Sequence, residues 1–318
     1  MLKQQCNARS TRSNSDGLSS VFLLVNHVIS WSGGKDSTAT VILMHEHKNE
    51  LVKEGDKVTI LFSEVMFDKK RNISGHNPDN IKFIYEKKKI FEKWGFRVEI
   101  LHSDKDYLDV FFHKLTRSPD PSRVGLTHGF VRSSICAVKR DCKLKPINKW
   151  FIDNPGEITE YIGIAVDEPK RLESLHKCGN MVSLLEKYNL TEEDAKELCI
   201  KYDMLLPQYT LLKDQKREGC WFCPNAKLCE HRAVKEQMPE AWKAYVELEN
   251  TPNLAYSKWN PYTKETLHQR DKILKHGYKQ ITLFDFVNIT SKADAKAYYA
   301  VKEMKGQTTL FDYLKGIA

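Results

Sequence analysis

The stretch Ser32-Gly33-Gly34-Lys35-Asp36-Ser37 lies between a β-rich run at residues 25–31 and a segment with helical content at residues 36–46. A bound phosphate needs N–H donors, and two adjacent glycines let the backbone approach it closely. The helix that follows adds its N-terminal dipole, the serines add hydroxyl groups and the lysine adds a positive charge. We therefore predict a phosphate-binding loop at this strand-to-helix turn.

Asp36 allows two interpretations within this loop. Its carboxylate could cap the helix, or it could help to hold the magnesium ion that accompanies a nucleotide. The alternative for the whole stretch is an ordinary strand-to-helix turn capped by Asp36. We favour the phosphate loop because six suitable residues follow one another between a strand and a helix. It is not a Walker motif, since the Gly-x4-Gly-Lys-Ser/Thr spacing is absent.

Strand-like runs alternate with helical patterns through the first half of the chain. Because helices that separate strands make right-handed crossovers, this order predicts an α/β fold with a doubly wound parallel sheet. Beyond residue 169 the patterns are mainly helical, and we identify no further strand there. The expected strands are residues 25–31, 57–66, 97–101 and 160–166, and the expected helices include residues 81–93, 106–115, 139–151, 192–202 and 240–248.

The 318 residues are enough for one large domain or two modest ones. The first twenty residues are polar and rich in Ser, Arg and Asn, so we expect a disordered leader over residues 1–24. We expect a nucleotide-binding α/β domain over residues 25–200. A helical, cysteine-bearing region and the C-terminal segment then make up residues 201–318.

A second motif, Gly163-Ile164-Ala165-Val166-Asp167-Glu168, belongs to the expected fourth strand and its end, and Arg171 follows shortly after. Open α/β sheets bind ligands at the carboxyl ends of their strands, so Asp167 and Glu168 could bind magnesium or orient a nucleophile. The alternative is that both residues cap a helix that begins at Pro169.

These two motifs carry a family resemblance. The loop Ser32-Gly33-Gly34-Lys35-Asp36-Ser37 resembles the signature of the PP-loop ATP pyrophosphatases. The second motif is similar to the Gly-Ile-Arg-Ala-Asp-Glu stretch of the phosphoadenosine phosphosulfate (PAPS) reductase-like family, although Ala165 stands where that family usually carries arginine. The resemblance covers residues 25–235.

The resemblance implies a domain that binds ATP with Mg²⁺ and cleaves it between the α- and β-phosphates. The AMP part then activates an oxygen atom of the substrate. Residues 32–37 would bind the nucleotide. The implied catalytic residues are Lys35, Asp36, Asp167 and Glu168.

Three of the eight cysteines are closely spaced: Cys220 and Cys223 form a Cys-x2-Cys pair, and Cys229 follows. Thiolates with this spacing can converge on one metal ion or cluster, and a fourth ligand would come from Cys142, Cys136 or His231. The PAPS reductase-like family and the PP-loop enzymes of DNA phosphorothioation carry similar cysteines around a [4Fe–4S] cluster. We expect such a cluster on Cys142, Cys220, Cys223 and Cys229, with Cys136 as the alternative fourth ligand and Zn²⁺ as the alternative metal.

One missing residue separates this chain from the best-known reaction of the family. PAPS reductases use a redox cysteine in a C-terminal Glu-Cys-Gly-Leu/Ile-His motif, but no cysteine follows Cys229. We therefore expect adenylation of a substrate for sulfur transfer, with AMP and pyrophosphate as products. A sulfonucleotide reductase acting on PAPS or adenylyl sulfate is the alternative.

The expected partners follow from charge and from a repeat. The formal net charge of +8 suits a nucleic-acid acceptor, although a lysine-rich solvated surface would give the same charge. A sulfur-donor protein would supply the sulfur. No stretch approaches the ~20 apolar residues of a membrane span, so we expect a cytoplasmic protein without a membrane partner.

The segments Gln280-Ile281-Thr282-Leu283-Phe284 and Gln307-Thr308-Thr309-Leu310-Phe311 resemble peptides that dock into bacterial sliding clamps. Such peptides place a Leu-Phe pair in an apolar groove. The alternative is that each phenylalanine packs on the chain's own core. A third hypothesis for the whole chain is accordingly an accessory protein that binds nucleic acid or a clamp without turning over a nucleotide.

Overall fold

The computed structural model describes residues 24–132, 136–211, 219–260 and 265–276. The expected leader, except for residue 24, lies outside these residues. Both Gln-x-x-Leu-Phe segments lie outside them as well, so the clamp hypothesis stays a prediction.

Tertiary contacts divide the chain into two compact units, each assembled from two separate segments. The first unit consists of Met1–Asp106 and Lys139–Gly219, and the second of Tyr107–Val138 and Cys220–Ala318. The first unit therefore extends beyond residue 200, where we expected a boundary. The second unit also includes residues 107–138, which we had expected within the α/β domain.

The centre of the first unit is a five-stranded sheet in which every pair of neighbouring strands is parallel. The spatial order is β5-β2-β1-β7-β8. This order and the helices around the sheet confirm the predicted α/β fold with a doubly wound parallel sheet. The strands are β1 (Val25–Ser30), β2 (Lys57–Glu64), β5 (Arg97–His102), β7 (Glu157–Tyr161) and β8 (Met181–Val182).

Helices and one hairpin connect these strands. The hairpin β3–β4 (Met66–Asp68 and Ile73–Ser74) follows β2, and the π-helix η2 (Lys139–Leu144) leads into α6. The α-helices of the first unit are α2 (Lys35–Glu46), α3 (Lys48–Leu51), α4 (Pro78–Lys93), α6 (Lys145–Asp153), α7 (Pro169–Leu175), α8 (Leu184–Lys187), α9 (Glu192–Lys201) and α10 (Gln208–Leu211).

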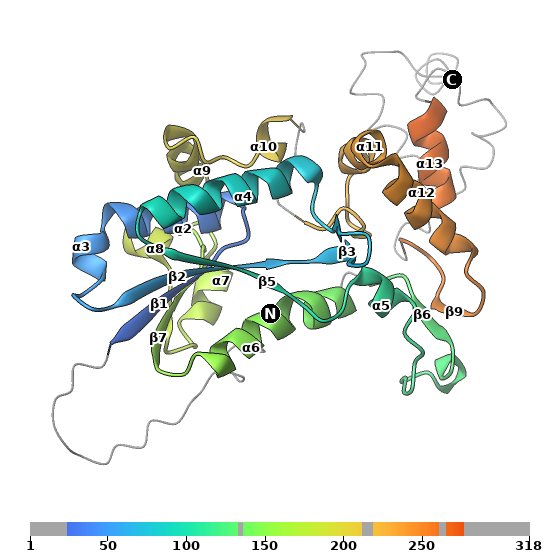
Figure 1. Ribbon diagram of the computed structural model, residues 1–318, viewed down its shortest axis with the longest axis horizontal. Coiled ribbons are helices and arrows are strands. Elements are labelled where there is room, and N and C mark those ends of the chain that lie inside the picture. The colour runs from blue at the N-terminus through green and yellow to red at the C-terminus, as the bar shows by residue number, and fades with distance from the viewer. Residues whose placement is uncertain (1–23, 133–135, 212–218, 261–264, 277–318) are drawn as a thin grey trace, which may run out of the picture. The chain divides into compact units, whose positions relative to one another are not determined.

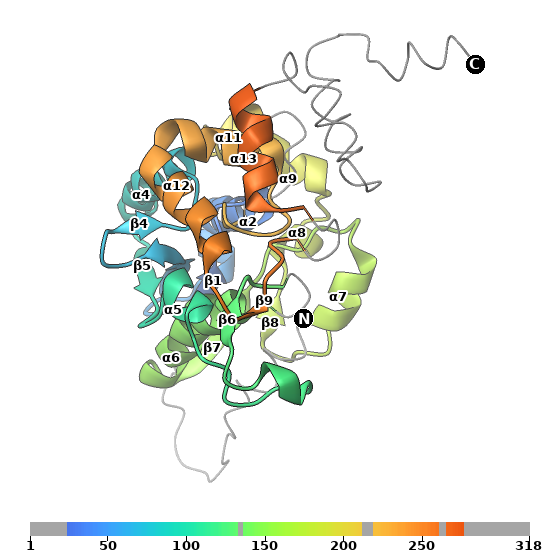
Figure 2. The ribbon, with the colours of Figure 1, turned by 90° about the vertical axis from the view of Figure 1, so that its right-hand side faces the viewer.

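Successive residues of the central strands face opposite sides of the sheet, as strand geometry requires. Val28 and Leu61 pack with Trp150 of α6 on one face. Ile29 and Phe62, each one residue further along, pack in the larger cluster with residues of α2, α4, α8 and α9 on the other face. Figures 1 and 2 both show α4 and α6 on opposite sides of the sheet. Burial on both faces explains why these strands read as continuous apolar runs.

The second unit is mainly helical and has an aromatic core. Its elements are α5 (Tyr107–Phe111), η1 (Pro121–Arg123), β6 (Thr127–Gly129), α11 (Leu228–Gln237), α12 (Pro239–Glu247), η3 (Leu248–Asn250), β9 (Leu254–Tyr256) and α13 (Leu267–His276), with β6 and β9 parallel. Asp271 of α13 accepts from Trp242 Nε1 of α12 at 2.6 Å and pairs with Lys235 Nζ of α11 at 3.0 Å. One carboxylate therefore ties together the three longest helices of this unit.

The short strands β4, β6, β8 and β9 and one strand boundary differ from the sequence prediction. The strands β8 and β9 lie beyond residue 169, where we identified none. The fourth main strand is β7, which ends at Tyr161, whereas we expected it to continue to Val166. Ile164 and Ala165 are fully buried although they lie outside any strand. Their apolar side chains therefore gave the same sequence pattern as a buried strand.

Candidate functional site

The glycine loop lies at the point where the strand order of the sheet reverses. From β1 the chain moves to β2 and β5 on one side and later to β7 and β8 on the other. Open α/β sheets bind ligands at such a switch point, outside the carboxyl ends of the strands. The loops that leave β1 and β7 flank this point, and they carry the two motifs found in the sequence.

The glycine loop is held in shape by its own serines. Gly33 has a φ of 81°, in the left-handed region that glycine adopts without strain. Ser37 Oγ accepts from the Ser32 backbone N–H at 3.1 Å and donates to the Gly34 carbonyl at 3.0 Å. Gly34 is the N-cap of α2, so the N-cap residue itself brings no side-chain acceptor to the first N–H groups of the helix. These groups remain oriented as donors for an anion.

Lys35 is 8% exposed and makes two ion pairs. Its Nζ lies 2.6 Å from Asp36 Oδ1 and 3.1 Å from Glu192 Oε2. Burial alone would lower the pKa of Lys35, but the bonds to these two carboxylates outweigh it and raise that pKa. Lys35 therefore carries a full positive charge at neutral pH, beside the first turn of α2.

Asp36 stands in a group of acidic side chains. Burial raises the pKa of its carboxyl, the contact with Lys35 lowers it, and the charges of Glu192 and Glu168 raise it again. Crowded carboxylates of this kind favour the binding of a cation, because a cation relieves their mutual repulsion. Asp36 is thus a candidate ligand for the magnesium ion of a bound nucleotide.

The second motif packs directly against the glycine loop. A Cβ atom on Gly163 would lie 2.5 Å from the carbonyl carbon of Asp36 and 2.7 Å from the backbone nitrogen of Ser37. Asp167 Oδ1 accepts from the backbone N–H of Glu192 at 3.1 Å, so it caps the first turn of α9. Glu168 is the N-cap of α7 and pairs with Arg171. The structure therefore brings Lys35 and Asp36 together, and Asp167 caps α9 beside them. Glu168 acts on the pKa of Asp36, and its side chain makes no capping hydrogen bond to α7.

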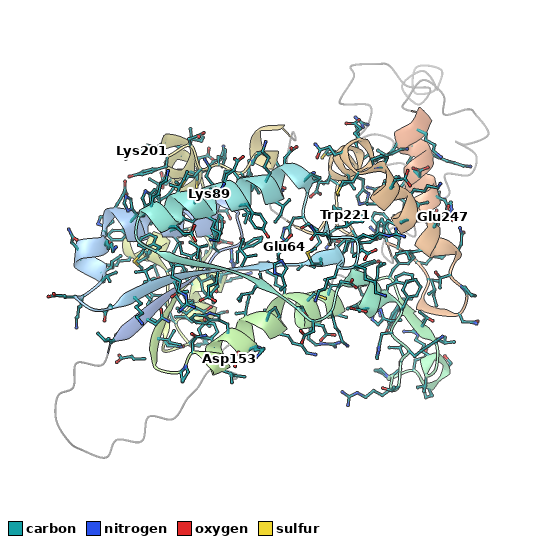
Figure 3. All side chains as sticks on the ribbon, in the orientation of Figure 1. Glu64, Lys89, Asp153, Lys201, Trp221 and Glu247 are labelled. Carbon is teal, nitrogen blue, oxygen red and sulfur yellow. The ribbon has the colours of Figure 1, made fainter. Side chains whose placement is uncertain are left out.

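A second polar group lies at the carboxyl ends of β2 and β5. Glu64 is 5% exposed and accepts from His102 Nε2 at 2.9 Å and from the Tyr85 hydroxyl at 3.0 Å. Burial would raise the pKa of Glu64, but the bonds from His102, Ser74 and Tyr85 together lower it. Figure 3 labels Glu64 between α4 and the sheet. This ionised carboxylate fixes an exposed imidazole at the carboxyl ends of β2 and β5.

The closely spaced cysteines belong to the second unit. Cys220 and Cys223 are half-buried, whereas Trp221 and Phe222 between them are buried in the aromatic core. Cys229 lies in the first turn of α11, and burial raises the pKa of its thiol. Trp221, labelled in Figure 3, anchors this turn through its carbonyl oxygen, which accepts from His231 Nε2 at 2.8 Å.

The candidate fourth ligands differ in their surroundings. Cys136 belongs to the second unit, where its side chain is half-buried. Cys142 belongs to the first unit, where its Sγ donates to the Asp106 carbonyl at 3.5 Å. His231 is fully buried in the aromatic core and has its Nε2 engaged, so it acts as a packing residue.

Within the described parts of the chain, no three His, Cys, Asp or Glu residues are grouped so that they could hold a metal ion. The cysteine donors are therefore not assembled into a four-ligand cage in this structure.

Sequence reasoning missed Glu192 and the Glu64–His102 pair. The capping box of Thr191 and Asp194 indicates where α9 begins. No local pattern indicates that Glu192, the first residue of this helix, contacts Lys35. Glu64 and His102 end two strands that neighbour each other in space, and their contact depends on the register of those strands.

No protein-family model matches the chain, and no curated protein sequence matches it significantly. Among the helices of the described residues, none has the length and apolar character needed to cross a membrane.

Proposed function

We propose that the first unit binds ATP with Mg²⁺ at the glycine loop and cleaves it between the α- and β-phosphates. One observation carries this proposal: the glycine loop and the second motif meet, through Gly163 and Asp36, at the switch point of a parallel sheet. This is where an open α/β sheet binds a nucleotide. The resemblance of both motifs to the PP-loop enzymes of the PAPS reductase-like family is the basis for proposing cleavage between the α- and β-phosphates.

In the proposed reaction an oxygen atom of the acceptor attacks the α-phosphorus of ATP. A bond forms between this oxygen and the phosphorus, the bond to the bridging oxygen of the β-phosphate breaks, and the electron pair leaves with pyrophosphate. The N–H groups of the first turn of α2 and the ammonium group of Lys35 bind the departing pyrophosphate. A sulfur nucleophile then displaces AMP from the activated acceptor.

The magnesium ion needs few ligands from the protein. Mg²⁺ in nucleotide sites commonly binds one or two carboxylates and completes its shell with phosphate oxygens and water. Asp36, with its crowded carboxylate beside the loop, fits this role.

The acceptor is proposed to be a nucleic acid. The formal net charge of +8 favours contact with a polyanion. A basic surface binds phosphate backbones without regard to sequence, so RNA and DNA both belong in the test.

The test of this function separates the two possible cleavage products. The full chain is incubated with ATP, Mg²⁺ and pools of RNA, DNA or small acceptors, and the nucleotide products are resolved. We expect AMP and pyrophosphate, with loss of both in Lys35→Ala. ADP and phosphate, or no turnover with any acceptor, would contradict the proposal.

We further propose that Cys136, Cys220, Cys223 and Cys229 hold a metal centre in the second unit, either a [4Fe–4S] cluster or Zn²⁺. The support is that all four belong to the same unit and that Cys220, Cys223 and Cys229 are closely spaced in the sequence. Since these donors are not assembled around a metal position in this structure, no step of the reaction is derived from the centre.

A further inference from the structure

A buried pair of amide side chains joins α4 to α10 in the first unit. Asn80, in the first turn of α4, is 1% exposed, and its Nδ2 donates to Oε1 of Gln208, the first residue of α10. The other amide atom of Asn80, Oδ1, is buried and has no hydrogen-bond partner among the described residues. An unsatisfied buried acceptor costs about 1–3 kcal/mol, so this oxygen calls for an explanation.

Both ends of this amide pair are anchored beside the glycine loop. Ile84 lies one helical turn after Asn80 on the same face of α4, and its Cδ1 would be 2.5 Å from a Cβ atom on Gly33. Tyr209 follows Gln208, and its hydroxyl would be 3.6 Å from a Cβ atom on Gly34. The unsatisfied oxygen therefore belongs to a side chain next to the proposed phosphate site.

The amide groups of Asn80 and Gln208 favour a nucleobase as the ligand over a further phosphate group. An amide oxygen with a free lone pair repels an anion but accepts a hydrogen bond from a neutral amino group. Side-chain amides recognise the edge of adenine in this way, through its 6-amino group. The half-buried ring of Tyr209, whose hydroxyl lies near Gly34, offers an aromatic surface on which a flat base can stack.

We propose that Asn80 is the residue that selects adenine, with its Oδ1 accepting a hydrogen bond from the 6-amino group of the base. Gln208 is a positioning residue, since its Oε1 accepts from Nδ2 of Asn80 and so fixes which amide atom is left for the base. This inference rests on the proposed ATP site, and it adds a determinant of base specificity that neither sequence motif contains.

The inference predicts a specific pattern of nucleotide affinities. The full chain is titrated with ATP, ITP and CTP in the presence of Mg²⁺ by isothermal calorimetry. ITP carries an oxygen where ATP carries the 6-amino group, so we expect the wild type to bind ATP on the order of tenfold tighter, or about 1.4 kcal/mol. CTP also offers an exocyclic amine, but on a smaller ring, and is expected to bind more weakly than ATP.

Asn80→Leu keeps the approximate size of the side chain and removes the acceptor. We expect this variant to bind ATP and ITP within about threefold of each other. Asn148→Leu is the matched control, because Asn148 Oδ1 is also buried without a partner but lies on α6, which packs on the other face of the sheet. The control should keep the wild-type preference. Asn80→Ser serves as a second variant, and thermal unfolding checks that each protein is folded.

The outcomes separate the inference from the proposed function. Equal affinity of the wild type for ATP and ITP, or a preference that survives in both folded Asn80 variants, would overturn the role of Asn80 and leave the ATP site standing. CTP binding as tightly as ATP would overturn the assignment to adenine. Failure of the wild type to bind any of the three nucleotides would overturn the proposed function together with the inference.

Discussion

Gly163 contacts the backbone of Asp36 so closely that no side chain fits between them. A Cβ atom on Gly163 would lie 2.5 Å from the Asp36 carbonyl carbon and 2.7 Å from its oxygen. Separations below about 3 Å are repulsive, because the favourable distance between nonbonded heavy atoms is about 3.5–4.0 Å. The loop after β7 thus sets the position of the glycine loop after β1.

Substituting Gly163 by alanine should displace the glycine loop and weaken nucleotide binding. We expect Gly163→Ala to lose about 1–3 kcal/mol of stability and to bind ATP on the order of tenfold more weakly. The matched control is Gly179→Ala, since a Cβ atom there would meet no atom within 4 Å. Calorimetric titration and thermal unfolding measure the two effects. Wild-type ATP affinity in Gly163→Ala would show that the contact between the two motifs does not shape the site.

Glu192 would compete with the proposed nucleotide for Lys35. The Nζ of Lys35 lies 3.1 Å from Glu192 Oε2, so a triphosphate that reaches Lys35 also meets this negative charge. Glu192→Gln removes the charge, and we expect it to tighten the binding of metal-free ATP by about threefold to tenfold. The effect on Mg²⁺–ATP should be smaller, because the metal already neutralises part of the phosphate charge.

The control for Glu192 is its neighbour in the sequence. Glu193→Gln removes a carboxylate that pairs with Lys196 at 2.7 Å, without changing the contacts of Lys35. It should leave both affinities unchanged in the same titrations. An equal gain in the two variants would mean that only the net charge of the protein matters.

The fold could be predicted from the sequence wherever buried apolar residues recur with the period of a strand or a helix. The apolar runs of β1 and β2 predict strands that are covered on both faces. Val28 packs in the cluster on one face of the sheet and Ile29 in the cluster on the other, which explains why both residues are apolar. Residues 162–166 are equally apolar, but Ile164 packs against α7 instead of pairing in a strand. The two residues of β8 are too few for any period to appear.

Contacts between distant segments could not be read in this way. Residues 107–138 join the second unit through contacts such as the ring pair of Tyr107 and Phe222, whose centroids lie 4.3 Å apart. The motif residues of the glycine loop were found because they are consecutive. The pairing of Lys35 with Glu192 needs a helix from the end of the first unit, and no local pattern encodes it.

Metal analysis can show whether Cys136 or Cys142 supplies the fourth ligand of the metal centre. The protein is purified without oxygen, and iron, sulfide and zinc are measured for serine variants of each cysteine. We expect Cys136→Ser and Cys220→Ser to lower the metal content. Cys142→Ser should retain it, because this thiol is buried in the first unit and bonds to the Asp106 carbonyl. Loss of metal in Cys142→Ser with retention in Cys136→Ser would restore the ligand set expected from the sequence.

Glu64 should make the stability of the first unit depend on pH. The pKa of Glu64 lies below its ordinary value of 4.5, because the bonds from His102, Ser74 and Tyr85 outweigh the effect of burial. The folded state therefore favours the ionised form. The resulting stabilisation is fully present above pH 4.5 and is lost as the pH falls through the lower, folded-state pKa.

Glu64→Gln tests this dependence directly. At pH 7 we expect the variant to be less stable than the wild type by about 1.5–3 kcal/mol, since it loses hydrogen bonds to a buried charge. The difference should shrink as the pH falls from 4.5 through the lower, folded-state pKa, because the wild type then loses the same charge. Urea unfolding followed by tryptophan fluorescence measures it, with Glu86→Gln on the exposed face of α4 as the control. A difference that stays constant over this pH range would mean that Glu64 stabilises the fold through its shape and not through its charge.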